Sequence, residues 1–437
     1  MMNVRSREFA VPFLQSLIQV DTCNPPGNEH RLSLLLQEFF HEAGLESSIT
    51  GIEQGRSNLE AVFKGGGSRK LMFCGHLDTV SPWTAEAGSY PPHGAVIEDG
   101  KMYGRGTSDM KSGLAAMLLA AVSLHQDGIR LGGDLVFLAT AGEEVDSCGA
   151  RQYAEQHSLA ELDGLVIAEP TGSRVAVGHK GALWLRISLF GRSAHGSMPQ
   201  LGLNAVEGMM ELIALIHRHA LEWQAHDPVL GSSSLSVNKI DGGVQTNVIP
   251  DRCTIDVDIR TVPPLRHAEL LSEITAKLEE IQERHSGYRY QVEELLDRSV
   301  VYTDPGEELI RIALELAGQA DGKGERESDG KDRARDYGAG GAGGAGGAES
   351  AADPEDVGDG DGSSDGVKDA VPAVRGVSYY TDASVLHDYG RLPVLIYGPG
   401  DPGLAHQPDE WIDIEAYLDS IEFYRKLAIS YLGVFGD

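Results

Sequence analysis

The segment LMFCGHLDTV, residues 71–80, joins an apolar, strand-like run directly to polar side chains. Two later segments have the same form, DLVFLATAGEE at 134–144 and LDGLVIAEP at 162–170. Between the first two lies MKSGLAAMLLAAVSLHQDG at 110–128, whose length and apolar content are typical of a helix. Such alternation of strands and helices predicts an α/β fold with a mostly parallel sheet and helices on both faces.

The pattern changes at about Leu183, where a different order of elements begins. The expected elements are, in order, a strand at 184–191, a helix at 204–223, strands at 233–240 and 253–262, a helix at 267–285 and a strand at 288–295. The order βαββαβ is that of a ferredoxin-like domain. A chain of 437 residues also exceeds the size at which one hydrophobic core stops growing, so two domains are expected.

The stretch 321–370 is dominated by Gly, Ala, Asp and Ser. It cannot bury enough apolar surface to fold, so we expect a disordered insert, and a flexible surface loop is a simpler interpretation than a partner-binding segment. Apolar segments return after it. We therefore expect one domain formed by 1–180, 297–320 and 371–437, with a second domain inserted at 181–296.

The composition limits the partners and the location. A formal net charge of −30 repels polyanions, which argues against binding to nucleic acid or anionic membranes. The four cysteines have no zinc-knuckle or redox-motif spacing, which fits a reducing compartment. No signal peptide is evident, and no run approaches the roughly 20 apolar residues of a membrane span. We expect a cytoplasmic protein that binds small molecules or cations.

Isolated carboxylates and histidines follow the predicted strands, where ligands bind in open α/β sheets. A carboxylate at the end of an apolar strand is costly to bury unless it is paired or binds a cation. Two histidines and three carboxylates suit zinc, and also cobalt or manganese. A two-metal centre bridged by Asp109 is therefore expected, with ligands drawn from His76, Asp109, Glu143 or Glu144, Glu169 and His406.

The adjacent residues Glu143 and Glu144 would have different roles, one as a ligand and the other as acceptor of a water proton. Asp78 stands two residues after His76 and could fix its tautomer through the imidazole N–H. Each motif alone has a plainer interpretation, such as a turn for HxD or a helix cap for Asp109. Their joint occurrence at strand ends favours a metal site.

The motifs GHLDTV, GRGTSDMKSG, ATAGEEV, IAEPT and AHQPDE, in this order, resemble the metallopeptidase family of acetylornithine deacetylase, succinyl-diaminopimelate desuccinylase, aminoacylase and glutamate carboxypeptidase. The resemblance covers nearly the whole chain except the insert. It implies a catalytic domain with an inserted lid or dimerisation domain. It also implies two zinc ions, one held by His76, Asp109 and Glu169, and a second held by the bridging Asp109 with Glu144 and His406.

The resemblance implies roles for three further groups. Glu143 would be the general base, and Asp78 would orient a histidine ligand. His195, in GRSAHGSMP, would polarise the substrate carbonyl, often from across a dimer interface. Without the motif, His195 would be interpreted as an ordinary surface histidine.

The resemblance also implies several substrate contacts. Arg260, in DVDIRTV, would bind the substrate carboxylate in a bidentate manner together with Asn247. The alternative for Arg260 is a solvated arginine at a strand edge. Thr381 and Asp382, in YYTDAS, and Gly398, in YGPG, match family turns near the substrate.

The implied activity is hydrolysis of the amide bond of an N-acyl amino acid by metal-activated water, in a homodimer that contains zinc, with cobalt or manganese as alternatives. Members that act as aminopeptidases tend to carry Asp where this chain has Glu169, which favours a deacylase or carboxypeptidase. The alternatives are a carboxypeptidase or dipeptidase that acts on short peptides, and a catalytically silent metal-binding protein.

Overall fold

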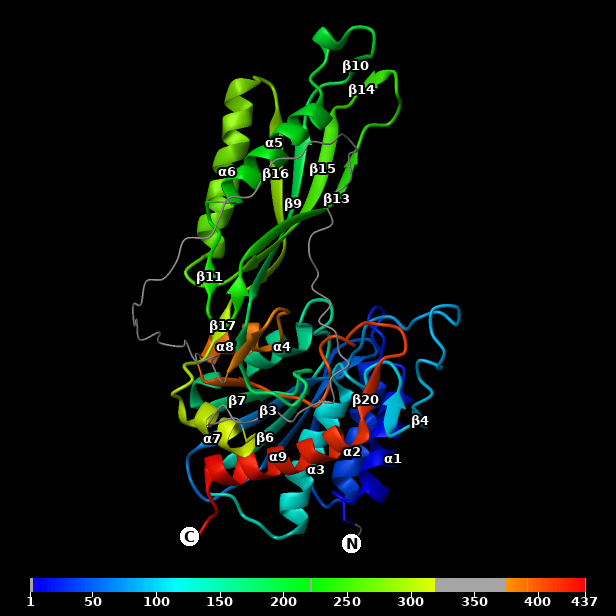
Figure 1. Ribbon diagram of the computed structural model, residues 1–437, viewed down its shortest axis with the longest axis vertical. Coiled ribbons are helices and arrows are strands. Elements are labelled where there is room, and N and C mark those ends of the chain that lie inside the picture. Colours follow the sequence, from blue (N-terminus) through cyan, green and yellow to red (C-terminus); the bar gives the residue numbers. More distant parts are fainter. Residues whose placement is uncertain (1–2, 221, 319–373, 391, 437) are drawn as a thin grey trace, which may run out of the picture.

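The computed structural model describes residues 3–220, 222–318, 374–390 and 392–436. The predicted insert at 321–370 lies outside these residues. The described chain forms a broad lower part, which holds both termini, and a narrower upper part (Figure 1). Among the helices of the described residues, none combines the length and apolar character needed to cross a membrane.

The lower part is built around a nine-stranded sheet. Its strands are, in spatial order, β1 (Ser48–Glu53), β2 (Arg56–Phe63), β6 (Asp134–Thr140), β3 (Lys70–His76), β7 (Gly164–Ile167), β19 (Val394–Ile396), β8 (Ala176–His179) and β17 (Val301–Tyr302), with β18 (Arg375–Val377) also beside β8. The central strands β6, β3, β7 and β19 are parallel, and antiparallel strands extend the edges. The predicted α/β fold with a mostly parallel central sheet is confirmed.

Helices cover both faces of this sheet. The lower face carries α1 (Arg7–Ile18), α2 (Glu29–Glu42), α3 (Lys111–Gln126), α7 (Glu308–Leu316) and α9 (Ile414–Leu432) (Figure 1). The upper face carries α4 (Cys148–Gln156) and α8 (Ala383–Gly390). Helix α3 is buried from Lys111 through Leu124 because it lies between the sheet and α9. A helix that is apolar on all sides is typical of such a central position.

The upper part is an antiparallel sheet with two helices. Its elements are β9 (Gly181–Phe190), α5 (Ala205–Ala220), β13 (Ser234–Gly242), β15 (Arg252–Thr261), α6 (His267–Arg284) and β16 (Arg289–Arg298). The spatial order β13-β15-β9-β16 and the chain order βαββαβ confirm the ferredoxin-like prediction. Alternate residues of β15 are buried, as expected of a strand with one face covered by helices.

Each part has its own hydrophobic core. The core of the upper part lies between its sheet and helices α5 and α6, and is separate from the core around the central sheet. We therefore propose the division into a catalytic domain and an inserted domain, called the lid below. Strand β9 begins at Gly181 and β16 ends at Arg298, so the lid sheet extends slightly past the expected boundary at 296.

Three small sheets complete the described chain, and one of them is the pair β11 (His226–Asp227) and β12 (Gly231–Ser232). The strands β10 (Ala194–His195) and β14 (Val248–Ile249) form a pair at the end of the lid farthest from the central sheet (Figure 1). The strands β4 (Val96–Glu98), β5 (Lys101–Tyr103) and β20 (Trp411–Asp413) form a three-stranded sheet in the catalytic domain. The three-stranded sheet connects the segment before α3 to the segment before α9.

Candidate metal centre

Three neighbouring parallel strands bring polar side chains to one edge of the central sheet. His76 is the last residue of β3 and pairs with Thr140, the last residue of β6. Glu143 and Glu144 follow β6, and Glu169 follows β7 on the other side of β3. Because carboxyl ends of parallel strands meet at one edge, residues nearly a hundred positions apart in the chain come together there.

Asp109 lies between the two histidines. Its Oδ1 is 3.1 Å from His76 Nε2, and its Oδ2 is 3.4 Å from His406 Nε2. His76 Nε2 also faces Glu169 Oε1 at 3.7 Å, and His406 Nε2 faces Glu144 Oε2 at 3.0 Å. The side chains thus form two groups that share one carboxylate, the arrangement that the family resemblance implies.

The charges of this cluster are unbalanced. Burial, followed by the charge of neighbouring carboxylates, raises the pKa of Glu143, Glu144 and Glu169. Hydrogen bonds to Asp109 and Glu144 raise the pKa of His406 to about 10. Buried carboxylates in such number require positive charge nearby.

The donor set fits a pair of divalent cations. The atoms that converge are imidazole nitrogens and carboxylate oxygens, which are ligands of zinc, cobalt and manganese. Glu144 Oε1 is buried and has no hydrogen-bond partner among the described residues. A cation would satisfy this atom, and Asp109 can offer one oxygen to each of two ions. The residues present therefore fit a dinuclear centre.

His406 has an unusual backbone conformation. Its φ angle of 65° lies in the left-handed region, which non-glycine residues adopt infrequently. Such a conformation costs on the order of 1–3 kcal/mol and is often retained at functional sites. Half of the His406 side chain is exposed, so this residue lies on the solvent side of the cluster.

Asp78 acts differently from the expectation. The main-chain oxygen of Asp78, rather than its carboxylate, lies 2.9 Å from His76 Nδ1, and the nearest carboxylate oxygen is at 3.6 Å. Since a carbonyl only accepts, Nδ1 carries the proton and Nε2 is free for a cation. The Asp78 carboxylate instead accepts hydrogen bonds from the Asn24 side chain and the main-chain N–H groups of Gly142, Glu143 and Glu144. It thereby fixes the turn that carries the predicted base.

Sequence reasoning missed a buried ion pair that holds two ligand loops. The Glu410 carboxylate is fully buried and accepts hydrogen bonds from the main-chain N–H groups of Gly106, Ser108 and Asp109. It also pairs with Arg105 Nη1 at 2.7 Å. Arg105 in turn donates to the main-chain oxygens of His406 and Gln407. The signal was present, because both residues stand inside the motifs GRGTSDMKSG and AHQPDE.

Two other expected site residues form hydrogen bonds next to the cluster. Asp382 Oδ2 accepts a hydrogen bond of 2.6 Å from Thr140, the partner of His76 across the sheet. Thr381 is buried, and its hydroxyl accepts from the N–H of Ala383 at the start of α8. In this arrangement Thr381 shapes a turn, while Asp382 reaches the strand end that carries His76.

Gly398 lies against the strand end that carries Glu169. A Cβ atom at this position would be 2.4 Å from the oxygen of Ala168 and 2.5 Å from that of Glu169. Real Cβ atoms do not approach backbone oxygens so closely, so glycine is required for close packing. Gly398 therefore positions a predicted ligand through its backbone.

Comparison with known proteins identifies the family. The model of Peptidase family M20/M25/M40 matches residues 72–336 and 362–430. The chain belongs to peptidase family M20/M25/M40. Members of this family, including a dinuclear metal-binding peptidase of Bacillus subtilis (13% identity, TM-score 0.64, 97% of both chains), share its fold. The chain is therefore a metal-dependent hydrolase, as predicted.

Curated M20 relatives are similar along the chain. A probable succinyl-diaminopimelate desuccinylase of Staphylococcus aureus (strain MRSA252) is 27% identical, over 99% of both chains. An acetylornithine deacetylase of Vibrio vulnificus is 35% identical, over 58% of this chain and 66% of its own length. A metallo-carboxypeptidase of Sulfolobus solfataricus has a TM-score of 0.69 at 15% identity, over 97% of this chain and 99% of its own.

In this M20 chain, Arg260 lies at the base of the lid. Its Nε is 2.9 Å from Asp258 Oδ1, and its guanidinium carbon is 6.0 Å from the ring centres of Trp184 and Tyr380. Tyr380 belongs to the catalytic domain and immediately precedes Thr381. Strand β15 lies between β13 and β9, so Arg260 is not on an edge strand. Because its guanidinium lies near Tyr380, Arg260 faces the junction of the two domains.

His195 and Asn247 lie together at the tip of the lid. His195 pairs with Val248 between β10 and β14, and the oxygen of Asn247 accepts from the N–H of Gly196. Both side chains are exposed, and His195 Nδ1 is 2.7 Å from Ser197 Oγ. This tip is the part of the lid farthest from the central sheet (Figure 1). Within one chain, these two residues are not brought to the metal-ligand cluster.

Proposed function

We propose that this chain hydrolyses the amide bond of N-acyl amino acids, in the manner of the desuccinylase and deacetylase relatives, as a cytoplasmic homodimer that uses two zinc ions. Cobalt or manganese would also suit the ligands. The observation that carries the proposal is Asp109 between His76 and His406, with Glu143 buried beside them. The proposed ligands are His76, Asp109, Glu144, Glu169 and His406.

Glu143 is the proposed general base. Two divalent cations at this cluster would polarise the scissile carbonyl and lower the pKa of a water molecule toward neutrality. Glu143 would accept the proton of that water and return it to the leaving amine, the role of a carboxylate within reach of the attacking water. The bonds from its N–H to Asp78 hold its backbone in place.

The lid is proposed to recognise the substrate. Arg260, at the junction of the domains, would bind the free carboxylate of the amino acid, and its fork of donors suits that group. His195 would donate a hydrogen bond to the oxyanion that forms at the carbonyl carbon, and Asn247 beside it would contact the substrate. Because His195 lies at the far tip in its own chain, we propose that a partner chain supplies it.

A carboxypeptidase or dipeptidase is the second candidate, because solved structures with this fold include a metallo-carboxypeptidase. A catalytically silent derivative would be expected to have lost a ligand or the base. Here the complete proposed ligand set and Glu143 are present and close together, which favours an active enzyme.

A substrate panel separates the two candidates. The purified chain, loaded with zinc, cobalt or manganese, is assayed on N-acetyl and N-succinyl amino acids and on dipeptides with the same carboxy-terminal residue. We expect kcat/KM for the acyl amino acids to exceed that for the dipeptides by at least about tenfold, which corresponds to about 1.4 kcal/mol of transition-state stabilisation. The reverse order would establish the peptidase alternative. No hydrolysis of either class with any of the metals would contradict the proposal.

A further inference from the structure

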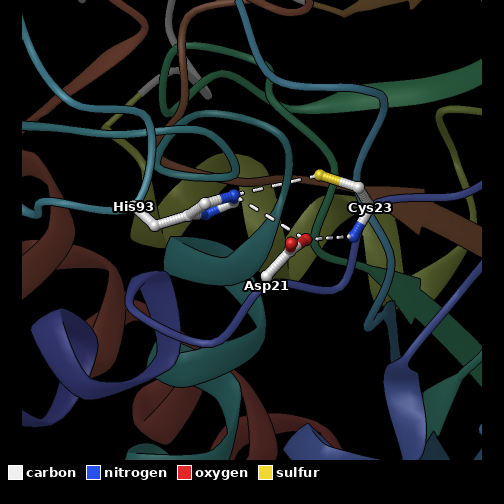
Figure 2. Close-up of side chains that lie close together, drawn as sticks. All are labelled: Asp21, Cys23 and His93. Carbon is white, nitrogen blue, oxygen red and sulfur yellow. Dashed lines mark hydrogen bonds and ion pairs between the residues drawn. The ribbon is translucent and has the colours of Figure 1, made fainter.

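A further group of side chains of the types that ligate metals lies in the catalytic domain, apart from the cluster described above. It consists of Asp21, Cys23 and His93 (Figure 2). His93 Nε2 is 4.0 Å from Cys23 Sγ and 3.7 Å from Asp21 Oδ1. The ring of His93 points its Nε2 at both partners, which come from a segment about seventy positions earlier in the chain (Figure 2). We propose that these three residues bind an additional, thiophilic divalent cation such as Zn²⁺.

The separations are close to those of a tetrahedral site. Zinc bonds to sulfur, nitrogen and oxygen imply ligand atoms about 3.3–3.6 Å apart. The observed separations of 3.7 and 4.0 Å need only small side-chain movements to reach this range. Asp21 can move, because 52% of its side chain is exposed. Three protein ligands leave a fourth position for water.

The local contacts of Asp21 do not account for His93. Asp21 Oδ1 accepts the N–H of Cys23 at 3.0 Å, which is an ordinary local turn. That contact leaves the other carboxylate oxygen available. His93, by contrast, is half-buried with its Nε2 directed at a thiol and a carboxylate. Convergence of nitrogen, sulfur and oxygen donors from two segments is what a cation site requires.

The environment favours the ligand forms of Asp21 and His93, whereas that of Cys23 requires loss of the thiol proton. Burial lowers the pKa of His93, which keeps the imidazole neutral. Burial raises the pKa of the Cys23 thiol to about 11, so the cation must displace the thiol proton to solvent, as in other thiolate sites. Hydrogen bonds from Cys23 outweigh burial and lower the pKa of Asp21. The ammonium of Lys111, bound to the oxygens of Leu17 and Val20, opposes the rise in the pKa of Cys23, but its effect is smaller than that of burial.

The donor atoms set the selectivity. The positive charge of Lys111 repels all divalent cations alike, so an ion must form strong bonds to sulfur and nitrogen to remain. Hard cations such as Mg²⁺ prefer oxygen ligands and bind thiolate poorly. The site is therefore expected to take Zn²⁺, Co²⁺ or Cd²⁺ and to reject Mg²⁺.

The proposed site would join two segments that support the catalytic cluster. Cys23 is followed by Asn24, whose side chain donates to Asp78. His93 follows Pro92, whose oxygen accepts the N–H of Arg105 at 2.7 Å. A bound cation would tie these segments together and stabilise the folded chain against thermal unfolding. This inference does not depend on which substrate the enzyme hydrolyses.

Cobalt provides the test, because a thiolate ligand gives Co²⁺ a sulfur-to-metal charge-transfer band that imidazole and carboxylate ligands do not give. The metal-free full chain is titrated with Co²⁺ and followed by absorption in the near ultraviolet. We expect a charge-transfer band in the wild type and in the control Cys148→Ser, and its loss in Cys23→Ser. In His93→Gln, the affinity for Co²⁺, measured from the rise of this band, should fall by more than about tenfold. Loss of an outer-shell partner already costs about tenfold or more, and His93 is a proposed direct ligand.

Two outcomes would overturn the proposal. The first is a wild-type chain that shows no charge-transfer band at saturating Co²⁺, a result that needs no variant. The second is a band that persists in Cys23→Ser or, if that variant does not fold, a band that forms in His93→Gln with the same Co²⁺ affinity as in the wild type. Failure of the two-metal mechanism would instead appear as absent hydrolysis with the charge-transfer band intact, so the two failures are distinguishable.

Discussion

The metal-ligand cluster and the tip of the lid differ in how complete they are within one chain. Most of the cluster is buried, with His76 only 1% exposed and His406 half-exposed, and its side chains contact one another. The tip carries His195 and Asn247 on the surface, at the opposite end of the molecule from most of the central sheet (Figure 1). One chain therefore brings the proposed metal ligands and the proposed base together by itself, whereas the proposed oxyanion donor needs a second chain or a large lid movement.

Exposed apolar side chains on the lid favour the second chain. Val244 is 84% exposed, Leu201 57% and Ile240 56%. Strand β13, which contains Ile240, is an edge strand of the lid sheet with one side unpaired. Apolar residues beside an open strand edge are typical of a surface that another chain covers.

The largest expected effect tests the proposed base in the buried cluster. Glu143→Gln keeps the size of the side chain but removes proton transfer, so kcat should fall by about 10²–10⁴-fold. Metal content, measured by elemental analysis, should stay equal to that of the wild type because Glu143 is not a proposed ligand. The control is Glu155→Gln, an exposed residue of α4. Retention of more than a minor part of the activity would remove Glu143 from the base role.

The second-largest effect tests the exposed tip of the lid. His195→Ala should lower kcat by about 10²–10³-fold, the usual result of removing one oxyanion donor, with the metal content unchanged. His226→Ala, at another exposed lid histidine, should have little effect.

A mixed dimer then shows where His195 acts. A chain with His195→Ala and a chain with Glu143→Gln are co-expressed with different tags, and the mixed dimer is purified through both. If His195 acts across the interface, one of its two sites is complete, and about half of the wild-type activity returns. Activity no higher than that of either parent, or full activity in a wild-type monomer, would show that the partner does not supply His195.

A smaller effect is expected at the ion pair between the two ligand loops. Glu410→Gln leaves the buried Arg105 uncompensated and weakens the contacts that hold Asp109 and His406. Metal affinity should fall by about 10–100-fold, measured as metal release to a chelator, and added metal should restore much of kcat. Glu415→Gln, in which a largely exposed carboxylate is changed, is the control. Unchanged metal affinity in Glu410→Gln would show that the ligand loops hold their positions without this pair.

The smallest effect is expected from backbone packing. Gly398→Ala places a methyl group against the oxygens of Ala168 and Glu169, and we expect a loss of about 1–3 kcal/mol in the free energy of unfolding, measured with denaturant. In Gly51→Ala the new methyl group meets no atom within 4 Å, so stability should change little. Equal stability of the two variants would show that the loop at Gly398 can shift to accommodate the methyl group, so that close packing there does not require glycine.

Local sequence patterns were sufficient for much of this molecule. The apolar runs that end at His76 and before Glu143 and Glu169 predicted strands with polar side chains at their carboxyl ends, and the strand-end rule predicted that they meet. The order of strand-like and helix-like segments in 181–296 predicted a ferredoxin-like unit. These features depend on residues close together in the chain, so the sequence alone determined them.

Long-range contacts decided the rest. The Glu410 carboxylate reaches main-chain groups about three hundred positions earlier, and it was the carbonyl of Asp78, rather than its side chain, that came to face His76. No local pattern contains the direction in which a side chain points once a turn is packed. The distance of His195 from the cluster likewise follows from how the lid stands on the catalytic domain, since packing between domains, and not periodicity along the chain, sets that distance.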